Sequence, residues 1–534
     1  MSRPTVTIVG SGASGVHLAL TLLRKGHRVR MLDVGRQGAV PVLPLATLNG
    51  LKRELADPVS YFLGSGFEAA HLPGVDDEYY GIPPSKNHVF DHPDGFRFVN
   101  SGFAPLFSFA RGGLAEAWTG GCYPLNADEV ADFPFTHGDL LPHYSEVARR
   151  IGVSGEVDDL ARFMPVHEHL QPGLRLDAHS ERLMASYARS HERLNREGVF
   201  MGRSRVATLS RPLGQREACD YRGRCLWGCP HASLYVPSLT LRECVDFPAF
   251  EYVPGVEVTR LRIGADRRVA AVVGRVNGES TEREFAVDYV ALAAGALLST
   301  RIFLNSVLRH SGERIRLTGL MDNRQAMVPF VNLGMIGRQF SAESYQYHLL
   351  GIGVESAVPR DYVHGQITTL KTALVHPLIQ RLPLDLATAT YAFRAVHAAL
   401  GLVNLNFRDT RREENFVELS EDADPVLRIH YQPDAGENER IAPSMRILKR
   451  ALRRLGCVVP PGMVHVRPMG ASVHYAGTIP MTRESRPFTT SEHCQSRDFE
   501  NLFLADGATF PFLPAKNLTF TLMANAVRVA EVAF

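Results

Sequence analysis

The stretch VTIVGSGASG, residues 6–15, decides the fold of the N-terminal part of this chain. Its first four residues are a β-branched run, as expected of a buried parallel strand. Each glycine that follows has a physical role. Gly10 makes the tight turn, Gly12 lets backbone N–H groups reach a pyrophosphate, and Gly15 lets a helix pack closely on the strand. The pattern predicts a dinucleotide-binding turn.

The residues after this turn supply the context that a bare glycine triplet lacks. A helical pattern covers residues 16–24, Gly26 breaks it, and residues 28–33 indicate a second strand that ends at Asp33. A carboxylate at this place accepts hydrogen bonds from a ribose and does not favour a 2′-phosphate. Strand, turn, helix, strand and acid in this order favour a Rossmann-type site over a plain strand–turn–helix, and disfavour NADP.

Further strand-like segments are spread along the rest of the chain. They occupy residues 250–253, 270–273, 289–293 and 502–505, whereas the βαβ pattern stops near residue 36. An NAD dehydrogenase usually completes its nucleotide domain within the next stretch of sequence. A nucleotide domain assembled from separated pieces suits an extended FAD, whose flavin lies far from its adenine.

Composition and charge restrict the class of protein. The chain has 534 residues, which indicates two domains or one large elaborated domain. Its 58 basic and 56 acidic residues give no case for nucleic acid or an anionic membrane surface. No apolar run of about twenty residues predicts a membrane span. Because a strand begins almost at Met1, we expect no signal peptide and a cytoplasmic protein.

The C-terminal part carries the candidate chemistry. The segment SVHYAGT, residues 472–478, places His474 before a Gly-Thr step, and Asn517 follows the segment LADGATFP at residues 504–511. Oxidation of an alcohol removes an O–H proton and a C–H hydride, and histidine is the natural base because its pKa lies near the operating pH. We expect His474 to take the proton and flavin N5 to accept the hydride, while Asn517 holds the same oxygen.

Two plainer interpretations remain open for these residues. His474 is one of 21 histidines, and a lone histidine is usually an ordinary surface or core residue. Asn517 could simply cap a helix at residues 518–529, a role that is compatible with catalysis.

In blocks spread from end to end, the sequence resembles the glucose–methanol–choline (GMC) oxidoreductase family. The blocks are residues 10–15, RGGLAEAW at 111–118, VEV at 256–258, AGALLST at 294–300, and the two segments around His474 and Asp506. The resemblance is greatest to the branch of pyranose oxidase and bacterial FAD-dependent glucose dehydrogenases. It implies an FAD domain and a substrate domain in which helices back a sheet.

The resemblance also implies roles for single residues. Val258 would contact the adenine end, and Asp506 the pyrophosphate or ribityl chain. Gly112 and Gly113 would lie near the flavin ring. Sugar-oxidising relatives carry a histidine bonded to the flavin where this chain has Ala117, so we expect the FAD to be non-covalent.

The segment CDYRGRCLWGCPH, residues 219–231, brings three of the seven cysteines close together in sequence. Cys219, Cys225 and Cys229 suit an iron–sulfur cluster, as similar trios in bacterial glucose dehydrogenases imply. A zinc site with His231 as fourth ligand, a disulfide, and buried thiols without metal are the alternatives. With a cluster, electrons would leave to a cytochrome-type acceptor. Without one, oxygen or a soluble redox carrier would take them.

We therefore expect an α/β fold with a Rossmann-type, GMC-like FAD-binding domain and a second α+β substrate domain built on an antiparallel sheet. The FAD domain would be discontinuous, over residues 1–60, 90–155, 195–310 and 460–534. The substrate domain would take residues 60–90, 155–195 and 310–460. The expected cofactor-binding residues are Gly10, Gly12, Ala13, Gly15, Asp33, Gly112, Gly113, Val258, Ala294, Gly295 and Asp506.

The function that these features favour is FAD-dependent oxidation of an alcohol, with a sugar or glycoside hydroxyl as the substrate. The alternatives are an iron–sulfur dehydrogenase linked to a cytochrome, an FAD-containing lyase of the hydroxynitrile type, and a flavoprotein that only binds. Retention of both His474 and Asn517 argues against the last. The sequence does not predict the oligomeric state.

Overall fold

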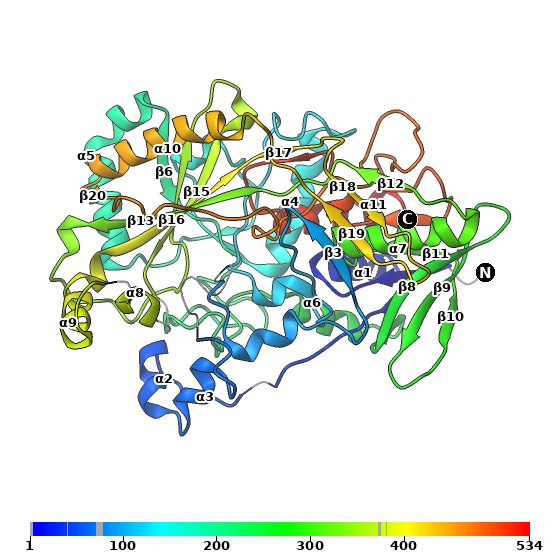
Figure 1. The fold of residues 1–534 in the computed structure, drawn as a ribbon, viewed down its shortest axis with the longest axis horizontal. Helices are drawn as coiled ribbons and strands as arrows, with labels where there is room; N and C mark the ends of the chain where they lie inside the picture. The colour runs from blue at the N-terminus through cyan, green and yellow to red at the C-terminus, as the bar shows by residue number, and fades with distance from the viewer. Residues whose placement is uncertain (1–3, 40, 71–77, 79, 372–374, 381) are drawn as a thin grey trace.

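The computed structural model describes residues 4–39, 41–70, 78, 80–371, 375–380 and 382–534. A five-stranded parallel sheet lies at one end of the molecule, close to both termini (Figure 1). Its strands, in spatial order, are β22 (Leu502–Leu504), β11 (Tyr289–Leu292), β1 (Thr5–Val9), β2 (Arg28–Leu32) and β7 (Phe250–Val253). The separated segments predicted from the sequence thus meet in one sheet, apart from residues 270–273.

The predicted strand–turn–helix is β1, a glycine turn and α1 (Ala13–Arg24). Gly10 has a φ of +99°, which favours glycine, and its amide donates to Leu32 O on β2 at 2.9 Å. A Cβ on Gly15 would lie 2.1 Å from Gly10 O, so α1 approaches the turn too closely for any side chain there. Helix α1 is held against β1 by these two glycines.

Both faces of the parallel sheet are buried, as such sheets require. One face packs on α1 and α11 through Val6 and Ile8 of β1 and Met523 and Val527 of α11. The other face packs on α7 and on a three-stranded antiparallel sheet. The three strands of that sheet are β8 (Val256–Ile263), β9 (Val269–Val276) and β10 (Glu282–Ala286). The helices of this domain include α4 (His137–Ile151), α6 (Pro237–Val245), α7 (Ala296–Ser311) and α11 (Thr519–Val532).

A seven-stranded sheet forms the other end of the molecule (Figure 1). Its strands pair antiparallel in the order β20 (Cys457–Val458), β13 (Arg324–Asn332), β16 (Leu400–Phe407), β15 (Val363–Thr369), β14 (Leu350–Val354) and β6 (Val199–Arg203), with β21 (His465–Val466) also on β13. Its apolar face packs on α5 (Ala178–Arg196) and α10 (Glu437–Arg454). The opposite face is polar and carries Gln325, Gln366 and Asn406.

Smaller elements connect the two large sheets. A four-stranded sheet contains β12 (Arg316–Thr318), β18 (Phe416–Leu419), β19 (Leu427–His430) and β3 (Phe98–Ser101). Two-strand pairs are β17 (Asp409–Thr410) with β23 (Phe512–Leu513), and β4 (Val153–Ser154) with β5 (Leu170–Gln171). The remaining helices are α2 (Leu48–Glu54), α3 (Pro58–Leu63), α8 (His376–Gln380) and α9 (Leu386–Val396).

The architecture confirms the expected fold class, a Rossmann-type α/β domain together with a domain built on an antiparallel sheet. The residue boundaries drawn between the two domains stay a prediction. Residues 71–77 and 79 of the segment 60–90, and 372–374 and 381 of the segment 310–460, lie outside the described residues. Within the described ranges, no helix is long and apolar enough to cross a membrane.

Candidate active site

A large cavity opens where β1, β2 and β11 end at their carboxyl termini, the edge at which open α/β sheets bind ligands. Its volume is about 1290 Å³ when the space open to solvent is included. The cavity is lined by both the glycine turn and His474.

Most of the residues predicted for the site line this one cavity. They are Gly10, Gly12, Ala13, Asp33, Gly113, Val258, Ala294, Gly295, His474 and Asp506. Three others are not in its lining: Gly15 packs behind the turn, Gly112 donates its amide to Ser11 Oγ at 2.9 Å, and Asn517 precedes the lining residue Leu518.

Asp33 is tied to the glycine turn by a side chain that the sequence analysis missed. Ser11 Oγ donates to Asp33 Oδ2 and accepts from the Gly112 amide, and Tyr252 OH donates to the same carboxylate oxygen at 3.0 Å. Burial raises the pKa of Asp33 to about 6, against these hydrogen bonds, which lower it. The carboxylate lines the cavity, where it can meet a ligand hydroxyl.

The turn fits the pyrophosphate of a dinucleotide. A Cβ on Gly12 would meet one atom, Ala293 O, at 3.9 Å, and a Cβ on Gly295 would meet nothing within 4 Å. Both glycines line the cavity, so the backbone lies open to a ligand on that side. No side chain caps the N-terminus of α1, whose free N–H groups and dipole favour a phosphate.

Asp506 connects two of the segments that line the cavity. Its Oδ2 accepts from the Gly295 amide at 3.0 Å and from Ser299 Oγ at 2.5 Å, and its Oδ1 accepts from the Ala508 amide at 3.0 Å. Burial raises the pKa of Asp506 to about 6. These bonds hold the start of α7 against the segment after β22, so two predicted blocks meet at one carboxylate.

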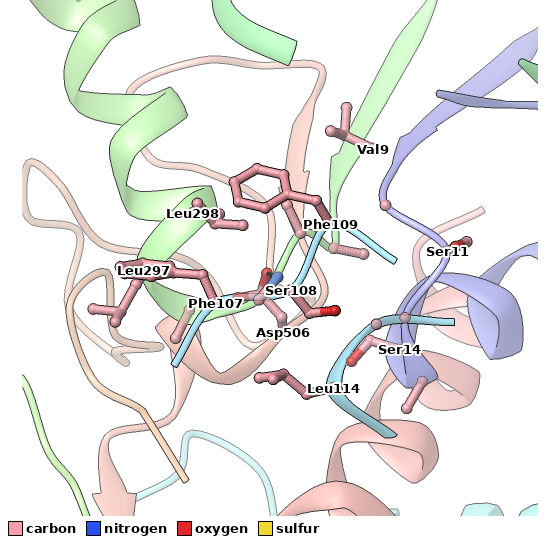
Figure 2. Close-up of a pocket in the computed structure, with 18 of the residues that line it drawn as sticks. Val9, Ser11, Ser14, Phe107, Ser108, Phe109, Leu114, Leu297, Leu298 and Asp506 are labelled. Carbon is pink, nitrogen blue, oxygen red and sulfur yellow. Dashed lines mark hydrogen bonds between the residues drawn. The ribbon is translucent and has the colours of Figure 1, made fainter. Parts of the chain in front are cut away.

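The segment of residues 106–110 forms a wall that the sequence analysis did not single out. Phe107, Ser108 and Phe109 lie between the glycine turn and the first residues of α7, Leu297 and Leu298 (Figure 2). Phe107 and Phe109 are buried and both pack on Phe96 with ring centroids 5.1 and 5.0 Å away. Because residues 106–110 lie in a long segment without helical or strand periodicity, the sequence did not predict this wall.

His474 lines the same cavity as Asp33, from the loop before the Gly-Thr step. Burial and, to a smaller extent, the nearby Arg467 guanidinium lower the pKa of His474 to about 4. The imidazole is therefore neutral at pH 7 and able to accept a proton. Its Nδ1 lies 3.1 Å from Asn323 Oδ1, a partner that the sequence analysis missed.

Asn517 makes a contact with the substrate-domain sheet and does not cap a helix. Gln366 Nε2, on β15, donates to Asn517 Oδ1 at 2.5 Å. Helix α11 begins at Thr519, and no side-chain cap bond is present at its N-terminus. The capping interpretation was wrong because the amide oxygen turns toward the sheet and away from the helix.

The cysteine trio does not form the metal centre that the sequence suggested. Cys219, Cys225 and Cys229 are free thiols, and among the described residues no group of three or more His, Cys, Asp or Glu side chains is placed to hold a metal ion. Burial raises the pKa of Cys219 to about 12, and that of Cys225 well above its usual value. Iron and zinc bind thiolates, and burial opposes ionisation of Cys219 and Cys225. Neither the iron–sulfur nor the zinc interpretation is supported.

Comparison with known proteins identifies a family signature in the C-terminal part. Residues 411–526, which include His474, Asp506 and Asn517, match the family model described as GMC oxidoreductase.

Two relatives align with 98% of this chain. One is 6'''-hydroxyparomomycin C oxidase from Streptomyces lividus, 25% identical and aligned over 90% of its length. The other is C-glycoside 3-oxidase from Microbacterium trichothecenolyticum, also 25% identical and aligned over 95% of its length.

Solved structures share the fold over nearly the whole chain. Pyridoxine 4-oxidase from Mesorbium loti superposes with a TM-score of 0.61 at 14% identity, covering 99% of both chains. Formate oxidase from Aspergillus oryzae gives a TM-score of 0.59 at 13% identity, covering 99% of this chain and 98% of that one.

Proposed function

We propose that this chain is a GMC-type, FAD-binding oxidoreductase that oxidises CH–OH groups, as its match to the family model over residues 411–526 and its similarity to the relatives above indicate. It oxidises one hydroxyl of a sugar or glycoside to a carbonyl, with His474 as the base and with FAD bound non-covalently. The observation that carries this proposal is that His474 and the glycine turn, far apart in sequence, line the same cavity.

Different residues of the cavity would hold the different chemical groups of FAD. The open backbone at Gly12 and the N-terminus of α1 suit the pyrophosphate, and Asp33 suits the adenosine ribose. Val258 and Asp506 line the same cavity and serve the adenine end and the pyrophosphate or ribityl chain. When bound, FAD supplies the acceptor for the hydride that the substrate C–H loses.

The protein groups handle the proton and the orientation of the substrate. His474, neutral at pH 7, takes the hydroxyl proton as the C–H bond is broken. The Asn517 side chain donates its amide hydrogens to the same substrate oxygen, since its Oδ1 is already held by Gln366. Two groups on one oxygen restrict the direction of the C–H bond, which lowers the entropy lost at the transition state.

The choice of a sugar-like substrate is supported by the relatives and by the sheet. The relatives named above are a paromomycin-type oxidase and a C-glycoside oxidase, and a third is paromamine 6'-oxidase from Streptomyces fradiae. The polar face of the seven-stranded sheet, with Gln366 touching Asn517, brings amide groups near the proposed oxygen site. Amides of this kind pair with both the donor and the acceptor of a hydroxyl.

Anaerobic titration of the purified protein tests the proposal. The flavin bands should appear in the visible spectrum and bleach on addition of one compound from a panel of sugars, glycosides and simple alcohols. Bleaching with simple alcohols alone would contradict the substrate class. A flavin that stays oxidised with every hydroxyl compound would contradict the reaction, and a colourless protein would contradict the cofactor.

A further inference from the structure

We propose that Asn323 is a positioning residue, which selects the nitrogen of His474 that acts as base and joins His474 to the segment carrying Asn517. The inference rests on the proposed roles of His474 and Asn517 and adds a residue that the family blocks do not contain. Asn323 lies immediately before β13, and its side chain is fully engaged in hydrogen bonds.

The orientation of the Asn323 amide is fixed by two backbone carbonyls. Its Nδ2 donates to Phe407 O at 3.0 Å and to Pro514 O at 2.8 Å, which uses both amide hydrogens. Turning the amide over would place Oδ1 against these two carbonyl oxygens and break both bonds. Asn323 Oδ1 must therefore face His474, and it can only accept a hydrogen bond there.

This orientation determines the tautomer of His474. Since Asn323 Oδ1 accepts, His474 Nδ1 at 3.1 Å must carry the proton and donate it. A neutral imidazole has one ring proton, so Nε2 holds the free lone pair. Nε2 is the nitrogen turned away from Asn323 and is the atom that takes the hydroxyl proton of the substrate.

The neighbouring Asp322 fixes the backbone of the same loop. Its carboxylate accepts from the Gly470 amide at 2.6 Å and from the Ser472 hydroxyl, and Ser472 Oγ accepts from the His474 amide at 3.0 Å. Asp322 thus orders the loop, and Asn323 orders the ring. Two consecutive residues at the start of one strand place both the backbone and the imidazole of His474.

Asn323 also reaches the segment that carries Asn517. Pro514, whose carbonyl accepts from Asn323 Nδ2, stands three positions before Asn517 in the chain. Phe407, the other acceptor, is the last residue of β16. A single amide therefore connects the two proposed catalytic loops with the substrate-domain sheet, and its loss would loosen His474 relative to Asn517.

The charged groups around this loop matter for any pH experiment. Arg467 lowers the pKa of His474, and burial raises the pKa of Asp322 to about 7 and raises that of Asp409, which accepts from the Asp322 amide. Asp322 and Asp409 are present in the wild type and in Asn323 variants alike. Only the difference between two variants at position 323 reports on the Asn323–His474 bond.

Two substitutions separate positioning from a structural role. Asn323→Ala removes the acceptor and should slow anaerobic flavin reduction about 10- to 100-fold, with a smaller change in KM. Asn323→Asp keeps an acceptor for Nδ1–H and adds charge, but it loses the two bonds to Phe407 O and Pro514 O. It should recover part of the rate lost in Asn323→Ala while moving the acidic limb of kcat/KM upward by about 1–3 pH units relative to that variant. Asn332→Ala, a buried asparagine at the far end of β13, is the matched control and should leave the rate and the limb unchanged.

A wild-type rate in Asn323→Ala, or an acidic limb that does not move in Asn323→Asp, would overturn the proposal.

If these variants fold poorly, ¹⁵N NMR of the ring nitrogens of the unmodified holoenzyme determines the tautomer of His474. Subtracting the His474→Gln spectrum should reveal a protonated Nδ1 and an unprotonated Nε2, and the opposite tautomer would refute the inference. This readout does not depend on activity. If no alcohol reduces the flavin, the proposed function fails, while the tautomer result still stands.

Discussion

At the residue scale, His474 is half-buried, and its ring Nδ1 faces a neutral amide and not a carboxylate. Asp322 holds the loop but not the imidazole, whose Nδ1 faces the neutral amide of Asn323. An ion-paired histidine would have a raised pKa, whereas burial and Arg467 lower the pKa of this one to about 4. The imidazole is therefore unprotonated over a wide range of pH.

This lowered pKa predicts the shape of the pH profile. A base acts only in its neutral form, so a lowered pKa extends activity toward acid. His474 should therefore contribute a limb of kcat/KM near pH 4, below the range of about 6 to 7 in which Asp33, Asp322 and Asp506 titrate. The measurement is the initial rate at low substrate from pH 8 down to pH 4. A profile with no further fall near pH 4 would contradict the lowered pKa of His474.

At the element scale, the β1–α1 turn separates two kinds of glycine. Gly15 is needed for packing, since its added Cβ would clash with Gly10 O, while Gly12 has open space on the cavity side. Gly15→Ala should reduce the free energy of unfolding by about 1–3 kcal/mol through overpacking. Gly12→Ala should unfold like the wild-type apoprotein yet bind FAD at least about tenfold more weakly, because its methyl group occupies the approach to the pyrophosphate.

Thermal unfolding of the apoproteins and flavin fluorescence titrations measure these two effects separately. Equal losses of stability in both variants, or unchanged FAD affinity in Gly12→Ala, would contradict the division of roles.

Elements with local signatures could be predicted from the sequence, and elements defined by distant partners could not. The parallel strands were recognisable because each is a short apolar run beside a turn or an acid, as with Asp33 and Asp506. The pairing of β6 with β14 had no local signal, because the partner residues are more than a hundred positions apart. The wall at residues 106–110 has no periodicity, and Asn323 is a lone amide whose three partners come from distant segments. The cysteine trio misled because closeness in sequence does not arrange side chains around one point, and among the described residues no group of three or more His, Cys, Asp or Glu is placed to hold a metal ion.

At the scale of the whole molecule, the segment before α11 is pinned by a buried ion pair. Lys516 Nζ donates to Glu129 Oε2 at 2.5 Å and to the carbonyls of Pro124 and Phe163, both at 2.8 Å. Burial raises the pKa of Glu129 and lowers that of Lys516, and their mutual attraction opposes both shifts. This pair brings residues 124–129 and the segment carrying Asn517 together.

Breaking this pair on one side should be more harmful than removing both charges. Lys516→Met leaves a buried carboxylate without its cation and should cost about 3–5 kcal/mol of unfolding free energy. The double variant Lys516→Met with Glu129→Gln should recover part of that loss. Chemical denaturation of the three proteins gives the comparison. A double variant no more stable than Lys516→Met alone would show that the unpaired carboxylate does not cause the loss, which contradicts the expected role of the charge pair.

The central claim is that His474 removes the hydroxyl proton at the cavity it shares with the glycine turn, and stopped-flow flavin reduction under anaerobic conditions tests it most directly. His474→Ala should slow reduction by about two to four orders of magnitude while FAD stays bound. His493→Ala, a change at an exposed loop histidine paired with Glu492, should leave the rate unchanged. A loss below about tenfold in His474→Ala, or an equal loss in both variants, would contradict the role of His474 as the base.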